Sequence, residues 1–183
     1  KINAIGLHNV YNGTASIIAG LLVGVKNNFI KSALINYVGV KRRFTYLGKV
    51  NCSSIYDDYA HHPTEILATL KGAKQVNKNI IVVFQPHRYS RTKILFNEFV
   101  NVLSKITRLY LLETYSAGEK KIKGFETKDI YKKLIKLKKN VDYVSTNNLN
   151  KIIYKETCKN NIIIFMGAGS ISKIASNFVK INE

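Results

Sequence analysis

Two short segments of the sequence gather most of the side chains suited to acid–base or anion-binding chemistry. The first, residues 57–65 (DDYAHHPTE), places two adjacent carboxylates beside a tyrosine and two imidazoles. Adjacent acids suit a nucleotide hydroxyl or a metal-bound water, and imidazoles accept or donate protons near neutral pH. Three of the four histidines, at 61, 62 and 87, fall in this segment and the next. This clustering favours a functional site over a polar turn in which Asp acts only as a turn former.

The second segment, residues 85–92 (QPHRYSRT), follows a fully apolar run and carries Arg88 and Arg91 three positions apart. If a helix begins here, the two guanidinium groups share a face and form a fork for a phosphate or carboxylate. Arginines in the first turn of a helix conflict with the helix dipole, and a bound anion would resolve that conflict. We therefore expect an anion site here rather than solvated arginines.

Two glycine-containing segments are less specific. Residues 113–119 (ETYSAGE) either orient the arginines through Glu113 or Glu119, or form an ordinary loop. Residues 167–175 (GAGSISKIA) lack the third glycine of the GxGxxG dinucleotide pattern. A tight turn before a helix that Ser170 caps is the favoured interpretation of that segment.

Two segments near the start of the chain each have two interpretations. Residues 8–12 (HNVYN) place two asparagines where they read an adenine edge or cap a helix. Residues 41–44 (KRRF) form a phosphate contact or a solvated charge cluster.

The elements that must position these segments alternate regularly along the chain. Continuous apolar runs predict strands at 54–56, 80–84, 109–112, 141–144 and 162–166. Apolar periodicity, with Pro63 as a first-turn residue, predicts helices at 14–25, 29–38, 63–76, 92–106, 130–137, 149–157 and 170–179. This alternation predicts an α/β fold with a mostly parallel sheet, whose ligands gather at the carboxyl ends of the strands. Both chemistry-bearing segments, and both glycine-containing ones, follow a predicted strand and therefore meet at one edge.

Composition excludes several classes of protein. With 183 residues, the chain has room for one medium domain and part of another, and 46% hydrophobic residues argue against disorder. No apolar run reaches the roughly 18 residues of a spanning helix, so we expect no membrane partner. The two cysteines, without a CxxC pair, predict semi-buried thiols in a reducing cytoplasm, with no disulfide framework and no metal site in this chain.

The net charge of +18 fits either attraction to polyanions or a compositional drift toward lysine. Lysines are scattered evenly and greatly outnumber arginines, although arginine is better suited to planar, bidentate recognition. We therefore favour drift and expect no nucleic-acid partner.

Taken together, the segments HNVYN, GVKRRF, DDYAHHPTE, FQPHRYSRT, ETYSAGE and MGAGSI resemble the ordered motifs of the Mur ligases, and specifically of the L-alanine-adding members. The resemblance runs from His8 to the last predicted helix, and QPHRYSRT is its most specific part. It implies a Rossmann-like C-terminal domain at residues 48–183, preceded at 1–47 by the helical end of a central ATPase domain. It also implies a cytoplasmic acid–amino-acid ligase of peptidoglycan synthesis, which serves cell-wall biogenesis, cell shape and cell division.

The implied reaction uses ATP to phosphorylate the lactyl carboxylate of UDP-N-acetylmuramate, after which L-alanine attacks the acyl phosphate. Such chemistry needs cationic groups that follow the developing negative charge. By resemblance, the catalytic residues are His61, His87, Arg88 and Arg91, the substrate-binding residues are Tyr59, His61, Arg88 and Arg91, and the ATP-binding residues are Asn9, Asn12, Arg42 and Asp58.

The sequence departs from the family pattern in two ways. Ser170 stands where the family usually has Asp, which matters little because both residues cap helices well. The GxxxxGK[ST] phosphate loop does not occur, so we expect Mg²⁺ ligands, the phosphate loop and the UDP-binding domain in upstream Mur ligase domains of the same or a separate chain. Because the chain begins with Lys1, we expect a cut inside a longer polypeptide. Because the phosphate loop is missing, we expect no ligase activity from this part alone. The alternatives are a non-catalytic remnant and a basic, polyanion-binding module.

Overall fold

The computed structural model describes residues 7–37, 39–77, 79–137 and 140–182. Contacts within the chain divide it into two compact units, Lys1–Lys41 and Arg42–Glu183. No helix in the described ranges is long and apolar enough to cross a membrane. The predicted boundary between an ATPase domain and a C-terminal domain, at residues 47 and 48, stays a prediction about function.

The first unit is a pair of helices, α1 (Leu7–Leu22) and α2 (Asn27–Ile35). The predicted helix at 14–25 begins earlier and ends earlier, because Gly24 adopts a left-handed φ of 79° and turns the chain. The predicted end of the next helix, residue 38, lies outside the described residues. The helices approach closely at Gly20, where a Cβ would lie 3.1 Å from Cδ1 of Ile30.

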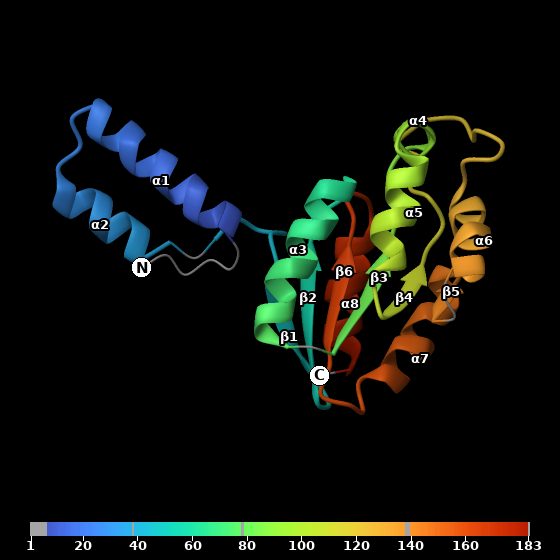
Figure 1. The fold of residues 1–183 in the computed structure, drawn as a ribbon. Coiled ribbons are helices and arrows are strands. Elements are labelled where there is room, and N and C mark those ends of the chain that lie inside the picture. Colours follow the sequence, from blue (N-terminus) through green and yellow to red (C-terminus); the bar gives the residue numbers. More distant parts are fainter. Residues whose placement is uncertain (1–6, 38, 78, 138–139, 183) are drawn as a thin grey trace. The chain divides into compact units, whose positions relative to one another are not determined.

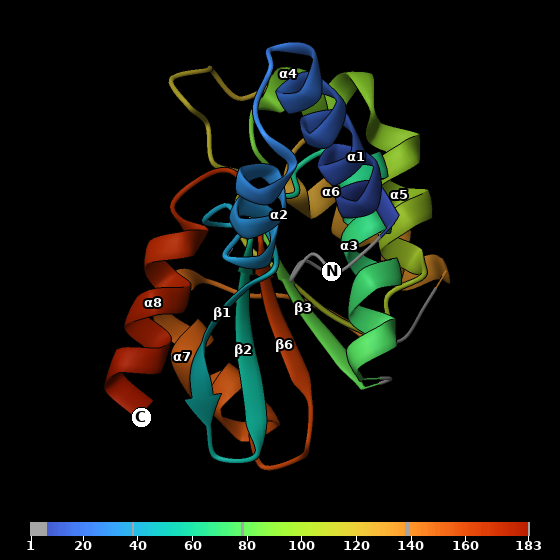
Figure 2. The same ribbon diagram turned by 90° about the vertical axis from the view of Figure 1, so that its left-hand side faces the viewer.

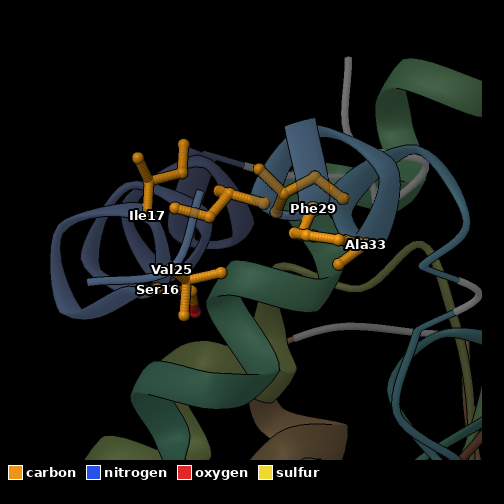
Figure 3. A pocket seen from close by; sticks show the side chains of 7 residues that line it. Ser16, Ile17, Val25, Phe29 and Ala33 are labelled. Carbon is orange, nitrogen blue, oxygen red and sulfur yellow. The ribbon is translucent and has the colours of Figure 1, made fainter. Parts of the chain in front are cut away.

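The apolar side chains of this helix pair are poorly covered. None of the residues of α2 is buried, and Leu22, Val23 and Phe29 are 82%, 77% and 62% exposed. A groove of about 280 Å³ runs between the helices, with Ile17, Phe29 and Ala33 among its lining side chains (Figure 3). An amphipathic helix normally buries its apolar stripe, but none of the described residues of this unit belongs to a buried hydrophobic core.

The second unit is a six-stranded sheet with helices on both faces (Figure 1). The strand order is β1-β2-β6-β3-β4-β5, and every neighbouring pair is parallel except β1 with β2. The strands are β1 (Thr45–Val50), β2 (Ser53–Asp58), β3 (Ile80–Phe84), β4 (Arg108–Leu111), β5 (Val141–Tyr143) and β6 (Ile162–Met166). The helices are α3 (Pro63–Val76), α4 (Tyr89–Ile94), α5 (Phe96–Ser104), α6 (Thr127–Leu137), α7 (Thr146–Glu156) and α8 (Ile171–Asn182).

Alternate residues of the central strands feed two hydrophobic cores. On one face, Val82 and Ile164 pack with residues of α3, α5 and α6. On the other face, Ile81 and Ile163 pack with residues of α7 and α8. Figure 2 shows these two helical layers on either side of the sheet. The three-layer arrangement confirms the predicted α/β fold with a mostly parallel sheet, and it explains why β3 and β6 are apolar at every position.

In this unit one strand was missed and one predicted helix was wrong. The strand β1 was not predicted, because its residues TYLGKV alternate at an edge of the sheet and include a glycine at a register shift. The single helix expected at 92–106 is two helices, and it breaks at Leu95, whose backbone (φ −109°, ψ 26°) leaves the helical region.

Candidate functional site

The carboxyl ends of the central strands lie level with one another. Asp58 of β2 and Phe84 of β3 both pair with Met166 of β6, and Phe84 pairs with Leu111 of β4. The segments that follow these four strands therefore begin side by side at one edge of the sheet. This edge, defined as residues 57–62, 85–92, 113–119 and 167–170, is called the carboxyl rim below.

His87 occupies the centre of the carboxyl rim. Nη1 of Arg91 lies 3.2 Å from Nδ1 of His87 and donates a hydrogen bond to the His87 carbonyl, also at 3.2 Å. The imidazole stacks on the ring of Tyr115, with centroids 5.4 Å apart and planes inclined by 14°. Two backbone bonds fix the same pair of loops, since Tyr115 N–H donates to the Pro86 carbonyl and Arg88 N–H donates to the Tyr115 carbonyl.

His61 reaches the rim from the end of β2, which β6 separates from β3 in the sheet. Its ring centroid lies 6.1 Å from that of His87 and 5.1 Å from that of Tyr59. Its Nδ1 lies 2.9 Å from the Tyr59 carbonyl and 3.5 Å from Oε2 of Glu65. The structure therefore brings together Tyr59, His61, His87 and Arg91, which the sequence analysis assigned to one site.

The surroundings of His87 favour its neutral form. Burial lowers the pKa of the imidazole, and electrostatic interactions with Arg91, the His61 ring and Arg88 lower it further, against a smaller opposing effect of Glu119. A cationic ring would add to a positive cluster, so this histidine is suited to hydrogen bonding as a neutral group.

Arg88 does not share a helical face with Arg91, contrary to the sequence prediction. It occupies the N-cap position of α4 with a left-handed φ of 71°, and its side chain is exposed. Both arginines still lower the pKa of the same imidazole, that of His87. Neither forms an ion pair within 4 Å in the part of the chain that the structure describes. Two cations without a carboxylate partner leave a place for an anion.

The two glutamates of residues 113–119 behave differently. Glu119 accepts hydrogen bonds from the backbone N–H and hydroxyl of Ser90 and so holds the first turn of α4. Glu113 instead accepts bonds from Tyr143 and Lys121. Of the two residues that were expected to orient the arginines, only Glu119 acts on this part of the rim.

Asp58 is an internal residue rather than an exposed ligand. Its carboxylate accepts the backbone N–H groups of Phe44 at 2.8 Å and Ala60 at 2.7 Å, and the residue is 3% exposed. Burial raises the pKa of this carboxyl, and the two N–H groups oppose the rise. In this geometry Asp58 organises the turns on either side of it.

Arg42 links two segments of the rim. Its Nη2 donates to the Gly167 carbonyl at 2.6 Å, its Nε lies 3.4 Å from Oδ2 of the buried Asp57, and its guanidinium lies 4.7 Å from the Tyr59 ring centroid. Asp57 also accepts a hydrogen bond from the hydroxyl of Ser172. The carboxylate pair 57 and 58 therefore serves the internal structure of the rim.

The glycine segment after β6 is tight for packing reasons. A Cβ on Gly167 would lie 2.6 Å from the Gln85 carbonyl oxygen, and one on Gly169 would lie 2.6 Å from Cγ of Tyr115. Gln85 is buried, and its Oε1 accepts the Ile171 N–H at the start of α8. The expected cap, Ser170, instead places its Oγ 3.4 Å from Oε1 of Gln85. This supports the structural interpretation of the GAGS turn.

The remaining predictions divide as follows. Asn9 and Asn12 lie in α1, in the first unit, and their role toward adenine stays a prediction. Cys52 and Cys158 are exposed rather than semi-buried. Within the described residues, no group of three or more His, Cys, Asp or Glu side chains is placed to hold a metal ion.

Two rim residues were missed by the sequence analysis, namely Gln85 and Tyr115. Both stand inside the segments that were singled out, but neither side chain has a chemistry that marks it from sequence alone. Their partners lie on other strands, so only the fold reveals their contacts.

Comparisons with known proteins agree with this architecture. The family model described as "Mur ligase, glutamate ligase domain" matches residues 42–169. A UDP-N-acetylmuramate–L-alanine ligase of Lachnospira eligens is 41% identical over 177 residues, which cover 96% of this chain and 39% of the relative. A protein of the same name from Caldicellulosiruptor saccharolyticus is 39% identical over 175 residues, which cover 94% of this chain and 38% of the relative.

A solved structure extends the similarity to three dimensions. The UDP-N-acetylmuramate-alanine ligase of Thermotoga maritima matches with a TM-score of 0.80 and 30% identity, and the match covers 98% of this chain and 39% of that chain. The chain thus spans about two fifths of the length of the relatives that it matches.

Proposed function

Because this chain belongs to the Mur ligase family, we propose that it forms the C-terminal part of a cytoplasmic, ATP-dependent enzyme that joins L-alanine to UDP-N-acetylmuramate in peptidoglycan synthesis. The relatives that carry this activity in their names match nearly the whole chain. Since the chain spans only part of them, the activity belongs to the complete polypeptide.

One observation carries the proposal more than any other. His61, His87, Arg88 and Arg91 converge on the carboxyl rim from the ends of β2 and β3, on either side of β6, and neither arginine has a described carboxylate within 4 Å. A cationic group of this kind suits a crowded anionic reaction, in which a carboxylate and a phosphate meet.

The reaction makes definite demands on these residues. The substrate carboxylate oxygen takes the terminal phosphoryl group of ATP, the amine nitrogen of L-alanine then attacks the acyl carbon, and phosphate leaves with the C–O electron pair. Arg88 and Arg91 bind the negative charge of the carboxylate and of the leaving phosphate. Tyr59 and His61 lie beside them, where they bind the amino acid.

The ATP-facing residues act in two ways. Arg42 presents its guanidinium at the rim, held by Asp57 and the Gly167 carbonyl. Asp58 supports the same turn through the Phe44 N–H, so we assign it an indirect effect on ATP. Asn9 and Asn12 are proposed to contact adenine from the first unit.

Mg²⁺ does not fit the residues described here. Asp57 and Asp58 are engaged inside the protein, and no other cluster of ligand residues exists in the described ranges. We assign the metal to upstream Mur ligase domains, on the same chain or another. The uncovered apolar surface of α1 and α2 supports the first unit as the end of a central ATPase domain that packs against them.

The proposal predicts a dependence on the rest of the enzyme. We expect no L-alanine-dependent phosphate release from ATP and UDP-N-acetylmuramate by residues 1–183 alone, and full release once the upstream domains are supplied. The assay measures phosphate with and without L-alanine, which separates ligation from ATP hydrolysis. Release by the isolated chain would contradict the assignment of the phosphate loop to another part, and no release by the complete protein would contradict the activity itself.

A further inference from the structure

The hydrogen bonds of His87 decide which ring nitrogen carries its proton. Nη1 of Arg91 lies 3.2 Å from Nδ1, and a guanidinium has donors but no acceptor. Nδ1 must therefore accept, and it does so only when it is unprotonated. The neutral ring that results carries its proton on Nε2, which becomes a hydrogen-bond donor toward a ligand.

The hydrogen bonds of His61 have the opposite consequence. Its Nδ1 lies 2.9 Å from the carbonyl oxygen of Tyr59, which only accepts, and 3.5 Å from Oε2 of Glu65. Nδ1 must therefore be protonated. In its neutral form the His61 ring then has a lone pair on Nε2, which makes this nitrogen an acceptor.

Tyr115 holds the ring plane of His87. The two rings are stacked within 14° of parallel, and the backbone of Tyr115 bonds to the residues on either side of His87. The contact is possible because residue 169 is glycine, since a Cβ there would lie 2.6 Å from Cγ and 2.7 Å from Cβ of Tyr115.

Charged groups close to this pair come from several elements. His87 faces Arg91 and Arg88 at α4, His61 after β2, and Glu119 from the loop that follows β4. His61 faces Glu65 of α3. The tautomers follow from the nearest donors and acceptors of each ring.

We propose that His61 and His87 are fixed in opposite tautomers, and that Tyr115, seated on Gly169, is the positioning residue that keeps the His87 Nε2–H directed into the site. Resting on the proposed function, this assigns a separate role to each histidine. His87 donates a hydrogen bond to an anionic oxygen of the acyl phosphate. His61 accepts at Nε2 the proton that the amine nitrogen loses as it bonds to the acyl carbon and phosphate departs.

The tautomers are testable without any activity. In the ¹⁵N-labelled chain, at a pH where both rings are neutral, long-range ¹H–¹⁵N spectra distinguish protonated from unprotonated ring nitrogens. We expect a protonated Nε2 with an unprotonated Nδ1 for His87, and the reverse for His61. The same tautomer in both rings would overturn the proposal while leaving the proposed ligase function untouched.

Variants at Tyr115 and Gly169 test whether Tyr115 holds the ring of His87 in place. We expect Tyr115→Phe to keep the tautomer of His87, because the stacked ring remains, and Tyr115→Leu and Gly169→Ala to average its two nitrogen signals. Tyr154→Leu is the matched control, since Tyr154 is 42% exposed against 41% for Tyr115. A merely structural role of Tyr115 would leave the His87 signals unchanged in every variant that folds. That result would contradict the proposal that Tyr115 positions His87.

The same substitution at both histidines separates their roles in the complete enzyme. Glutamine retains an amide N–H donor but is no base at neutral pH. We expect both variants to lower kcat, His61→Gln by about 10²-fold or more, the usual contribution of a general base, and His87→Gln by less than His61→Gln. Equal losses, or a larger loss for His87→Gln, would contradict the division of roles even if ligation itself is confirmed.

Discussion

Arginines at the amino ends and at the carboxyl ends of the parallel strands, called the amino edge and the carboxyl rim, have opposite surroundings. At the amino edge, Arg108 lies 2.6 Å from Asp142 and 3.2 Å from Glu156, and its guanidinium also contacts the hydroxyl of Tyr110. At the carboxyl rim, Arg91 contacts His87, and neither it nor Arg88 has a carboxylate within 4 Å in the described ranges.

The difference separates structural charge from charge that is available for binding. Arg108 has two acidic partners, so its charge is already balanced within the fold. Burial lowers the pKa of the neighbouring His87, and the charges of the rim arginines, which have no carboxylate within 4 Å in the described ranges, lower it further. A site that binds an anion must keep such unbalanced charge, and it does so at some cost in stability.

The largest expected effect comes from Arg91→Ala in the complete enzyme. We expect kcat/KM to fall by about 10²–10³-fold, because one charge-stabilising donor is removed from the rim. The free energy of unfolding should change by about 1 kcal/mol or less, the contribution of an ordinary hydrogen bond. Steady-state kinetics and urea unfolding measure the two quantities, and exposed Lys105→Ala is the control for loss of a positive charge. Near-normal kinetics in the Arg91 variant would remove the distinction between the two edges.

Tyr110→Phe tests the amino edge. The buried hydroxyl donates to Oε1 of Glu156 at 2.5 Å and lies 2.6 Å from Nη2 of Arg108. We expect the free energy of unfolding to fall by about 1 kcal/mol, because a buried hydrogen bond is lost, with turnover unchanged. Denaturant titration and kinetics of the same variant check this. A loss of turnover that exceeds the loss of stability would connect the amino edge to catalysis.

Glu65→Gln is expected to alter the pH dependence of stability. Burial works against the ionised form of Glu65, but the His61 backbone N–H, the His61 ring, the His62 N–H and Arg43 outweigh it and lower the pKa. A lowered pKa in the folded state means stability that is present above the unfolded pKa and is lost as pH falls through the folded pKa.

Unfolding of the Glu65→Gln variant should therefore depend less on pH in the acid range than unfolding of the native sequence. Glu98→Gln, at an exposed position in α5, is the control. If the stability of the Glu65 variant depends on pH in the acid range as strongly as that of the native sequence, this carboxylate does not hold the turn that carries His61.

The smallest effect is expected for Asp142→Asn. Its bond to Arg108 is short, but the Asp142 side chain is 48% exposed. An ion pair this open to solvent contributes about 0.2–1 kcal/mol and weakens as salt rises. Unfolding at low and high salt measures it, and a salt-independent loss would show that the pair acts through packing rather than charge.

Several elements could be predicted to the residue from the sequence. The strands β3 and β6 are continuous apolar runs, and the helix α3 begins at a proline. These signals are local, because burial on both faces and the geometry of a first helical turn depend on residues next to one another. The same local signals placed His61, His87 and Arg91 at one edge of the sheet.

Other features depended on contacts between distant segments. The edge strand β1 is stabilised by pairing with β2, and Leu95 interrupts a helix whose apolar pattern continues across the break. No pattern of neighbouring residues shows that Asp58 turns inward to two backbone N–H groups.

By itself, the sequence determined the fold class, the family and the set of reactive residues, because apolar periodicity and motif order depend only on the order of residues along the chain. Only the tertiary structure decided which partners each of those residues contacts. It directs Asp57 and Asp58 into the protein, moves Arg88 out of the helix, and places Tyr115 against His87 and Gly169. Hydrogen-bond direction, protonation and close packing depend on atoms that are far apart in sequence and meet only when the sheet is formed.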